Sequence, residues 1–244
     1  MQIVQPTAPV DLPDRLHSHG WALMTPEQLG DWLGATESDF QRLHDSWNRL
    51  EADAHLKDGG RYRKRRHSCY TLDIDGEALT QVEHRAHWQP VEYNALHGGI
   101  ERWFEPIEPA ISRHPVWRAL LTQLGVVLAR TLPTDTWFIE AHQFRVDTEG
   151  GIGRPTPEGA HRDGVDFVAV LLLERHGIKG GETRVFEADG PHGVRFTLQH
   201  PWSLLLLDDV RVIHESTPIQ PLQGYGWRDT LVLTFRRNSF QGPA

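Results

Sequence analysis

The pattern of apolar and polar positions divides the chain into a helical first half and a second half of short strands. An apolar stripe at helical spacing from Phe40 to Leu50 predicts an amphipathic helix that starts near Thr36 or Ser38 and runs to about residue 56. Thr25-Pro26 predicts the start of a shorter helix, because Thr suits the N-cap and Pro the first helical position. A further stripe bracketed by prolines predicts a helix over residues 116–132.

Beyond residue 133 the chain has the pattern of a β-protein. Runs rich in Val, Ile, Leu, Phe and Thr, separated by Gly, Pro and Asp, predict strands at residues 137–146, 167–173, 183–187, 203–207, 210–213 and 230–235. Short strands at this spacing favour a sandwich or barrel over alternating β and α units. Upstream, over residues 59–100, short β-like pieces such as residues 68–72 alternate with loops rich in Gly and His.

We therefore expect an α+β fold in which N-terminal helices buttress a C-terminal jelly roll. The expected divisions are a loose arm over residues 1–15, mainly helical support over 16–135 and the jelly-roll core over 136–237. The pattern contains no linker that would let the two halves move apart. We accordingly treat residues 1–244 as a single domain.

Composition and charge narrow the class of protein. Hydrophobic residues make up 39% and charged residues 24% of the chain, as in globular proteins. The net charge of −8 argues against a nucleic acid or an anionic membrane as the main partner. One cysteine excludes an intramolecular disulfide, and neither a signal peptide nor a long apolar span is visible. We expect a cytoplasmic protein.

The tripeptide His161-Arg162-Asp163, just before the predicted strand at 167–173, is suited to binding a metal ion. Residues i and i+2 of an extended chain point to the same side, so His161 and Asp163 can offer a nitrogen and a carboxylate to one ion. His214, after the predicted strand at 210–213, is the candidate third ligand. Two histidines and one carboxylate bind one face of Fe(II) and leave three positions open.

Arg228 lies fourteen residues after His214, at the start of the predicted strand at 230–235. Its guanidinium group is a rigid fork that binds a carboxylate through two hydrogen bonds. A dicarboxylate that chelates the metal through one end needs such a partner at its other end. Arg228 is therefore the candidate anchor, although a surface arginine at a strand start is the alternative interpretation.

These residues, in this order, resemble the 2-oxoglutarate/Fe(II) dioxygenase superfamily. The chain is most similar to the small bacterial branch that includes L-isoleucine dioxygenase and other hydroxylases of free amino acids. The resemblance extends over about residues 60–237, more loosely at 93–104, and rests on residues 157–168, 180–182, 207–211, 214, 218 and 226–235.

The resemblance implies a double-stranded β-helix, the cupin-like form of the jelly roll. It also implies that His161, Asp163 and His214 bind Fe(II), and that 2-oxoglutarate is the cosubstrate of a reaction with O2. The expected reaction is hydroxylation of a C–H bond in a small polar substrate, a free L-amino acid with an aliphatic side chain. A modified amino acid or a protein side chain is the alternative substrate.

The resemblance adds Gln143 and Arg145 as candidate cofactor-binding residues. They share one face of the predicted strand at 137–146, which in this superfamily often lines the cosubstrate pocket. His142 and Phe144 share the other face. The alternative is an ordinary polar face of a strand.

Other charged residues are weaker candidates. Arg63, Arg65 and Arg66 suit a clamp for a substrate carboxylate, but we favour a solvated basic loop. Glu158 and Asp166 flank the metal motif and suit either a substrate ammonium group or a supporting role beside the ligands. Residues 147–159, which are rich in Gly and Pro, form the candidate mobile segment.

Two other classes of protein remain open at this point. A cupin-like metal-binding protein without turnover would not need a carboxylate anchor at Arg228. A zinc or manganese hydrolase would use the same three ligands but needs a general base, for which no motif is visible. A homodimer is left open as the state of assembly.

Overall fold

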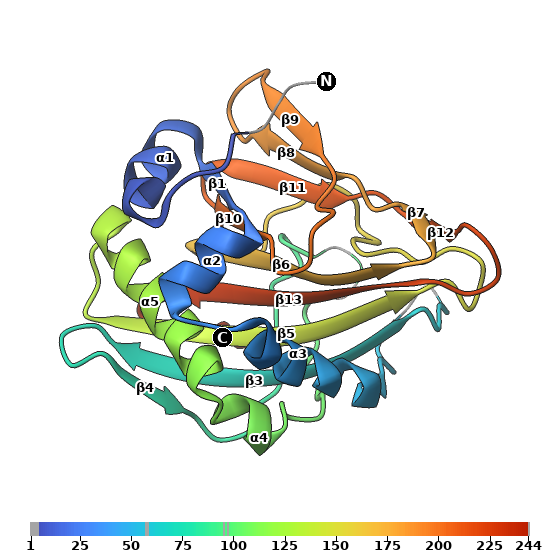
Figure 1. Ribbon diagram of the computed structural model, residues 1–244, viewed down its shortest axis with the longest axis horizontal. Coiled ribbons are helices and arrows are strands. Elements are labelled where there is room, and N and C mark those ends of the chain that lie inside the picture. Colours follow the sequence, from blue (N-terminus) through green and yellow to red (C-terminus); the bar gives the residue numbers. More distant parts are fainter. Residues whose placement is uncertain (1–4, 57–58, 95, 97, 244) are drawn as a thin grey trace.

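An antiparallel sheet of eight strands forms the centre of the computed structural model, which describes residues 5–56, 59–94, 96 and 98–243 (Figure 1). Neighbouring strands follow the order β1-β10-β6-β13-β5-β3-β2, and β4 pairs with β3. The strands of this central sheet are β1 (Trp21–Met24), β2 (Glu51–Ala52), β3 (Arg63–Asp73), β4 (Ala78–Gln81), β5 (Thr136–Asp147), β6 (Phe167–His176), β10 (Leu204–Asp208) and β13 (Trp227–Arg236).

Two smaller antiparallel sheets complete the β-structure and lie above the central sheet in Figure 1. One has the order β11-β8-β9 and the other pairs β12 with β7. Their strands are β7 (Ile178–Gly180), β8 (Thr183–Glu187), β9 (Gly193–Phe196), β11 (Val212–Ser216) and β12 (Ile219–Pro221). This arrangement confirms the predicted α+β jelly-roll class.

The helices cover one face of the central sheet. Figure 1 shows α5 running across the strands, with α2 beside it. The helical elements are η1 (Pro9–Asp11), α1 (Leu12–His19), α2 (Pro26–Leu33), α3 (Glu37–His44), η2 (Asp45–Arg49), α4 (Pro109–Ser112) and α5 (Pro115–Thr131). The largest apolar core lies between these helices and the sheet and includes Leu72, Leu124 and Trp137. No helix in the described part of the chain is long and apolar enough to cross a membrane.

The three predicted helices begin where they were expected, and one of them ends earlier than predicted. Thr25 caps α2 and Thr36 caps α3, each through a reciprocal capping box. The helix expected to continue to residue 56 ends at His44, followed by the short turn η2. Leu50 has an extended backbone, and the next two residues pair with β3. Sheet pairing therefore overrides helical periodicity there.

The N-terminal half contains more sheet, and a shorter arm, than its sequence pattern predicts. Residues 9–15, expected in a loose arm, belong to η1 and α1. Strand β3 extends over Arg63–Asp73 and pairs with β5 along its whole length. The prediction identified only residues 68–72 of this strand. The first residues of β3, 63–66, lie in the basic segment that we interpreted as a solvated loop, and that interpretation is wrong.

The register of the central sheet decides which side chains face the smaller sheets. His67 of β3 lies opposite His142 of β5, which lies opposite Val232 of β13. Alternate residues of these strands therefore share one inner face. Val232 packs on that face with the core cluster of β6, β10 and β11, away from the helices. The inner face forms one wall of the cavity described below.

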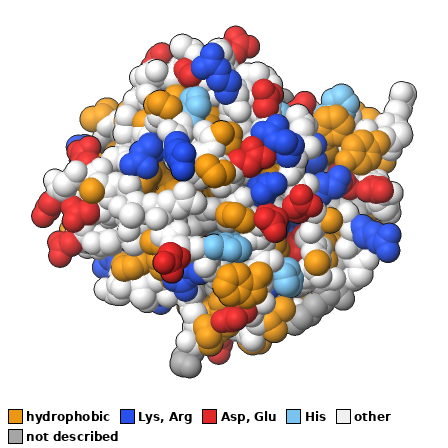
Figure 2. Space-filling model, turned by 90° about the horizontal axis from the view of Figure 1, so that it is seen from below, with side chains coloured by type: hydrophobic (Ala, Val, Ile, Leu, Met, Phe, Trp, Pro, Cys, Tyr) orange, Lys and Arg blue, Asp and Glu red, His pale blue; other side chains and the backbone are white. Residues whose placement is uncertain are grey.

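Side chains of both charges share the face of the molecule seen in Figure 2. On the face shown in Figure 2, acidic and basic side chains alternate and are interspersed with histidines and single apolar residues. This face therefore presents no continuous patch of one sign.

Candidate active site

His161, Asp163 and His214 meet at the edge of a cavity. The backbones of His161 and His214 form a two-way bridge, with both N–H···O distances at 3.0 Å. Nε2 of His161 lies 3.8 Å from one carboxylate oxygen of Asp163, and Nε2 of His214 lies 3.7 Å from the other. The potential ligand atoms all lie within 4.8 Å of one another. One ion can therefore contact all three side chains.

A hydrogen bond at His161 and the low pKa of His214 leave a ring nitrogen of each histidine available to a metal ion. Nδ1 of His161 lies 2.9 Å from the carbonyl oxygen of Gly159, which places the proton on Nδ1 and leaves Nε2 as the ligand atom. Burial and the nearby His161 hold the pKa of His214 well below its usual value. Burial also lowers the pKa of His161, but Asp163 and Glu158 outweigh this and raise it overall. The same carboxylates would favour a bound cation.

Asp209 holds the loop that carries Asp163. Its two carboxylate oxygens accept backbone N–H groups of Asp163, Gly164 and Val165 at 2.8–3.1 Å. Gly164 has φ +76°, and a Cβ there would lie 2.4 Å from the Tyr93 ring. Sequence reasoning gave Asp209 no role. The only sequence feature that could have identified it is its position as an acidic residue after an apolar strand, and that feature is common in proteins.

Arg228 projects from β13 into the same cavity and is almost completely buried. Its Nε and Nη2 atoms have no hydrogen-bond partner within the described residues. Burial and the neighbouring Arg175 lower its pKa to about 10, and Asp229 offsets this only in part. The neighbouring guanidinium groups of Arg228 and Arg175, with their unsatisfied donors, are suited to binding an anion. The cavity thus contains both a metal-ligand set and a carboxylate partner.

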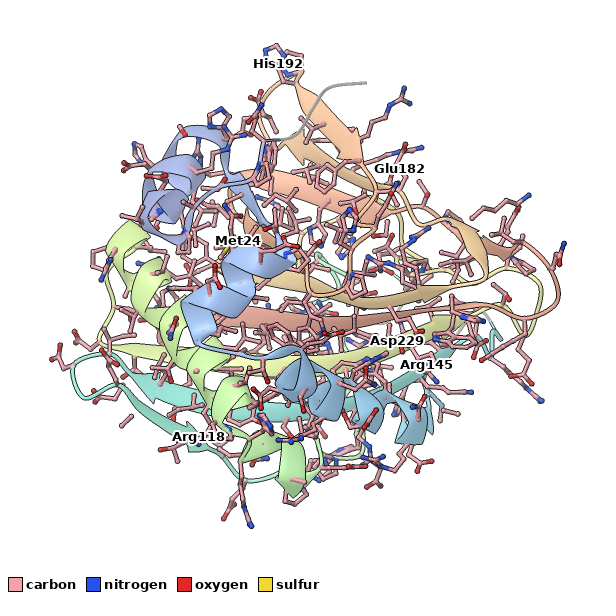
Figure 3. All side chains as sticks on the ribbon, in the orientation of Figure 1. Met24, Arg118, Arg145, Glu182, His192 and Asp229 are labelled. Atoms are coloured by element: carbon pink, nitrogen blue, oxygen red, sulfur yellow. The ribbon has the colours of Figure 1, made fainter. Side chains whose placement is uncertain are left out.

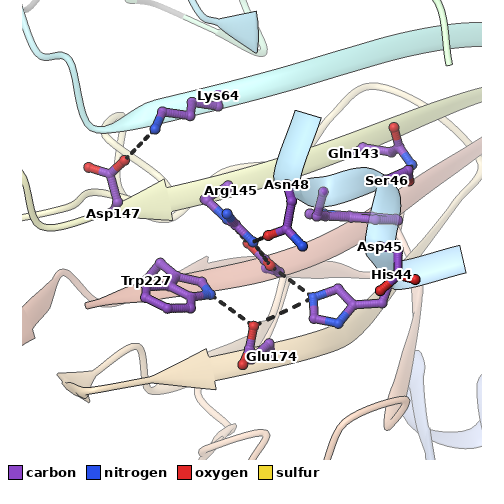
Figure 4. Close-up of polar contacts among 12 residues, drawn as sticks. His44, Asp45, Ser46, Asn48, Lys64, Gln143, Arg145, Asp147, Glu174 and Trp227 are labelled. Atoms are coloured by element: carbon purple, nitrogen blue, oxygen red, sulfur yellow. Dashed lines mark hydrogen bonds and ion pairs between the residues drawn. The ribbon is translucent and has the colours of Figure 1, made fainter. Parts of the chain in front are cut away.

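Gln143 and Arg145 do not face this cavity, so their predicted role as cofactor-binding residues is corrected. They point to the helix-covered face of β5 (Figure 4), where Gln143 donates to Ser46 at 2.8 Å. Arg145 donates two hydrogen bonds to Asp229 at 2.7 and 2.6 Å, and Figure 3 shows these residues side by side. The prediction identified the two faces of the strand correctly but chose the outer one.

The other charged candidates from the sequence also divide into residues that lie beside the cavity and residues that point away from it. Arg63 and Arg65 are buried in β3 and line the cavity, whereas Arg66 points outward and donates to two backbone carbonyls. Glu158 lies 3.5 Å from Nε2 of His161. Asp166 instead binds Arg237 and supports the chain end.

The segment at residues 147–159 borders the cavity. Pro155 and Thr156 line it, and Gly153 pairs with Ile219 of β12. Its movement remains a prediction.

Comparison with known proteins agrees with this geometry. A model of the family described as 2OG-Fe dioxygenase matches residues 44–234. A bsmA homolog from Methylobium petroleophilum PM1 is 53% identical, with 99% of this chain and 98% of that chain covered and a TM-score of 0.94. No curated protein matches the chain.

Two more distant structures share the fold. IDO from Bacillus thuringiensis is 18% identical, with 99% and 100% of the two chains covered and a TM-score of 0.77. The Fe(II)/(alpha)ketoglutarate-dependent dioxygenase TqaL is 20% identical, with 96% and 91% covered and a TM-score of 0.74. At these identities the likeness supports the fold alone. Because the family match covers most of the sequence, the chain belongs to the 2OG-Fe dioxygenase family and is a 2-oxoglutarate-dependent dioxygenase that uses Fe(II) and O2.

Proposed function

We propose that the protein hydroxylates a C–H bond of a free L-amino acid with an aliphatic side chain. In this proposal His161, Asp163 and His214 bind the iron and Arg228 binds the far carboxylate of 2-oxoglutarate. The observation that carries the assignment is that these four residues line a single cavity, although they come from three separate parts of the chain. Each of them was also a candidate from the sequence alone.

Each residue has a distinct task. Bound iron and 2-oxoglutarate together supply the oxidising power needed to attack a C–H bond. The two histidines and Asp163 would hold the ion, and as a set of three ligands they would leave positions for the cosubstrate, O2 and substrate. Arg228 orients the cosubstrate through its planar fork. Val170, Val232 and other apolar side chains beside these groups keep water away from the reacting atoms.

Two observations support a free amino acid over a macromolecule as the substrate. The sequence resembles the branch that hydroxylates free amino acids, and the cavity walls carry buried charges of both signs, such as Arg65 and Glu140. A modified amino acid or a protein side chain is the second candidate. Membership of the dioxygenase family argues against the non-catalytic cupin and the hydrolase. A homodimer and a cytoplasmic location remain expectations.

The test is succinate formation from 2-oxoglutarate under air with Fe(II) and ascorbate, across the common free L-amino acids. We expect one class of aliphatic amino acid to stimulate turnover and to gain a hydroxyl group. We expect His161→Ala to abolish turnover, while His192→Ala, a change of an exposed histidine in the β8–β9 turn, leaves it intact. Full activity in His161→Ala would remove the proposed iron site.

A further inference from the structure

A second group of ionisable side chains adjoins the same cavity on the side of β3 and β5. Glu140 and His142 come from β5, His67 from β3 and His87 from the segment after β4. All four are buried, and their polar atoms lie within 4.8 Å of one another. The roles proposed above for iron and 2-oxoglutarate do not use this group. It therefore needs a separate explanation.

Glu140 is the centre of the group and fixes the neighbouring rings. Its Oε2 accepts a hydrogen bond from Nε2 of His67 at 2.8 Å and one from Nδ1 of His87 at 2.7 Å. Burial alone would raise the pKa of Glu140, but the two histidines outweigh it and lower that pKa. Burial also lowers the pKa of His87 to about 3, so the ring is neutral. Nε2 of His87 therefore keeps a lone pair as an acceptor.

The group is not suited to a second metal ion. Nη2 of Arg65 lies 2.7 Å from Nδ1 of His142, and an arginine can only donate. Nδ1 of this neutral ring is therefore the acceptor, and the ring proton sits on Nε2, the atom that faces Glu140 at 3.8 Å. A protonated nitrogen cannot bind a metal. The guanidinium charge beside the ring also disfavours a cation.

Buried guanidinium groups stand next to Glu140. The Arg65 guanidinium lies 3.8 Å from the centre of the Phe104 ring and 4.5 Å from that of Phe144, so aromatic rings fix its orientation. Among the described residues, no partner accepts from Nε of Arg65 or Nε of Arg102. The carboxylate nearest to Arg65 is Asp53 at 4.0 Å, which already binds Arg63 at 2.7 Å. Both charges are thus incompletely neutralised.

One side chain connects these arginines to the proposed iron site. Gln89 donates from Nε2 to a carboxylate oxygen of Asp163 at 3.1 Å. Its Oε1 accepts from Nη2 of Arg102 at 2.9 Å. A ligand held by Arg102 would therefore lie close to the carboxylate that we assign to the iron. This is where the substrate of a dioxygenase has to bind.

We propose that this wall binds the substrate as a zwitterion, with Arg65 and Arg102 on its carboxylate and Glu140 with His87 on its ammonium group. An α-amino acid carries both charges on neighbouring atoms, and the wall offers donors and acceptors in the same small volume. The inference rests on the proposed function and deepens it, because it says how the substrate is recognised. Gln89 is assigned as a positioning residue for Asp163.

Substrate analogues test the inference first. Succinate formation is measured with each common free L-amino acid, with its carboxamide, which lacks the carboxylate, and with the matching acid that lacks the amino group. We expect stimulation by an amino acid, none by its amide and at least about 10-fold weaker stimulation by the des-amino acid, since charged hydrogen bonds contribute about 1.5–3 kcal/mol each. Equal stimulation by amide and amino acid would overturn the inference.

Variants of one strand supply the second test. Arg65→Met should raise the KM for the stimulating amino acid at least about 10-fold. Arg66→Met, the next residue along β3 but on its opposite face, should change this KM less than about twofold. Direct binding of the amino acid, measured by calorimetry under nitrogen with Fe(II) and 2-oxoglutarate, should weaken in parallel. Arg65→Lys, which keeps the charge, covers the case in which Arg65→Met does not fold.

The outcomes separate this inference from the proposed function. If 2-oxoglutarate is converted to succinate but no amino acid stimulates or binds, the zwitterion site is wrong and the dioxygenase reaction stands. If Arg66→Met weakens binding as much as Arg65→Met, the inner face of β3 is not the binding wall. If the iron-loaded protein forms no succinate under any condition, the proposed function fails, and this inference fails with it.

Discussion

Arg228 and Arg175 occupy facing positions on β13 and β6, and both are charged groups with unsatisfied donors. Arg228 is buried and Arg175 is partly buried, so two like charges at this position lower stability until a counter-ion binds. A β-bulge between Asp229 and Thr230 shifts the register at this point and leaves Arg175 paired with Arg228. Binding of a dicarboxylate would relieve the repulsion and satisfy the donors together.

Replacement of Arg228 tests this interpretation at the level of one side chain. Arg228→Met should raise the KM for 2-oxoglutarate at least about 10-fold, because a buried, charge-assisted carboxylate contact is lost. Steady-state kinetics with varied 2-oxoglutarate provide the measurement. Arg236→Met, on the same strand but bonded to Ser239 near the surface, is the matched control and should have little effect. An unchanged KM in Arg228→Met would place the anchor elsewhere.

Single residues were predictable where their chemistry is rare and local. His161 and Asp163 share a side because they are two apart, and Arg228 opens an apolar strand. Glu140, His67, His87 and Arg102 carry no such signal. They come from separate segments whose spacing has no common period, and only the pairing of β3 with β5 and the course of the chain after β4 bring them together.

At the scale of elements, β5 shows how far the alternation of side chains along a strand can predict which face lines a cavity. The sequence predicts the strand and its two faces, and the structure has it at Thr136–Asp147. Both faces carry polar residues, however, so alternation cannot say which one lines the cavity. Gln143 and Arg145 face the helices because Ser46 and Asp229 satisfy them there. The first part of β3 was missed because a basic run is normally solvated, whereas here the side chains of Arg63 and Arg65 line the cavity.

The contact between α5 and the central sheet gives a prediction about stability. Gly125 of α5 lies so close to β3 that a Cβ would be 2.2 Å from Leu72 Cδ2, and its carbonyl accepts from Trp137 Nε1. We expect Gly125→Ala to lower the free energy of unfolding by about 1–3 kcal/mol, because overlap outweighs the gain in helix propensity. Denaturant unfolding monitored by far-UV circular dichroism provides the measurement.

A glycine in another helix is the control for this substitution. A Cβ at Gly30 of α2 would meet its nearest atoms at 3.6 Å, an ordinary contact distance. Gly30→Ala should therefore raise the free energy of unfolding by about 0.5–1 kcal/mol. If both variants were equally stable, α5 would not pack as closely on the sheet as described.

At the scale of the whole molecule, the jelly roll separates an apolar core from a charged cavity. The helix side of the central sheet is packed with apolar residues such as Trp137 and Leu233, which stabilise the fold. The inner side holds the buried charges and two histidine clusters. Such groups are costly to bury without ligands, and we attribute their burial to the binding of iron, cosubstrate and substrate.

The central claim is that iron binds at His161, Asp163 and His214 and not at the other histidine cluster. The most direct measurement is an anaerobic titration with Fe(II) in the presence of 2-oxoglutarate, on the unaltered protein, His214→Ala and His67→Ala. We predict one tightly bound Fe(II) per chain, lost in His214→Ala and retained in His67→Ala. Retention of iron by folded His214→Ala, together with its loss from folded His67→Ala, would contradict the assignment.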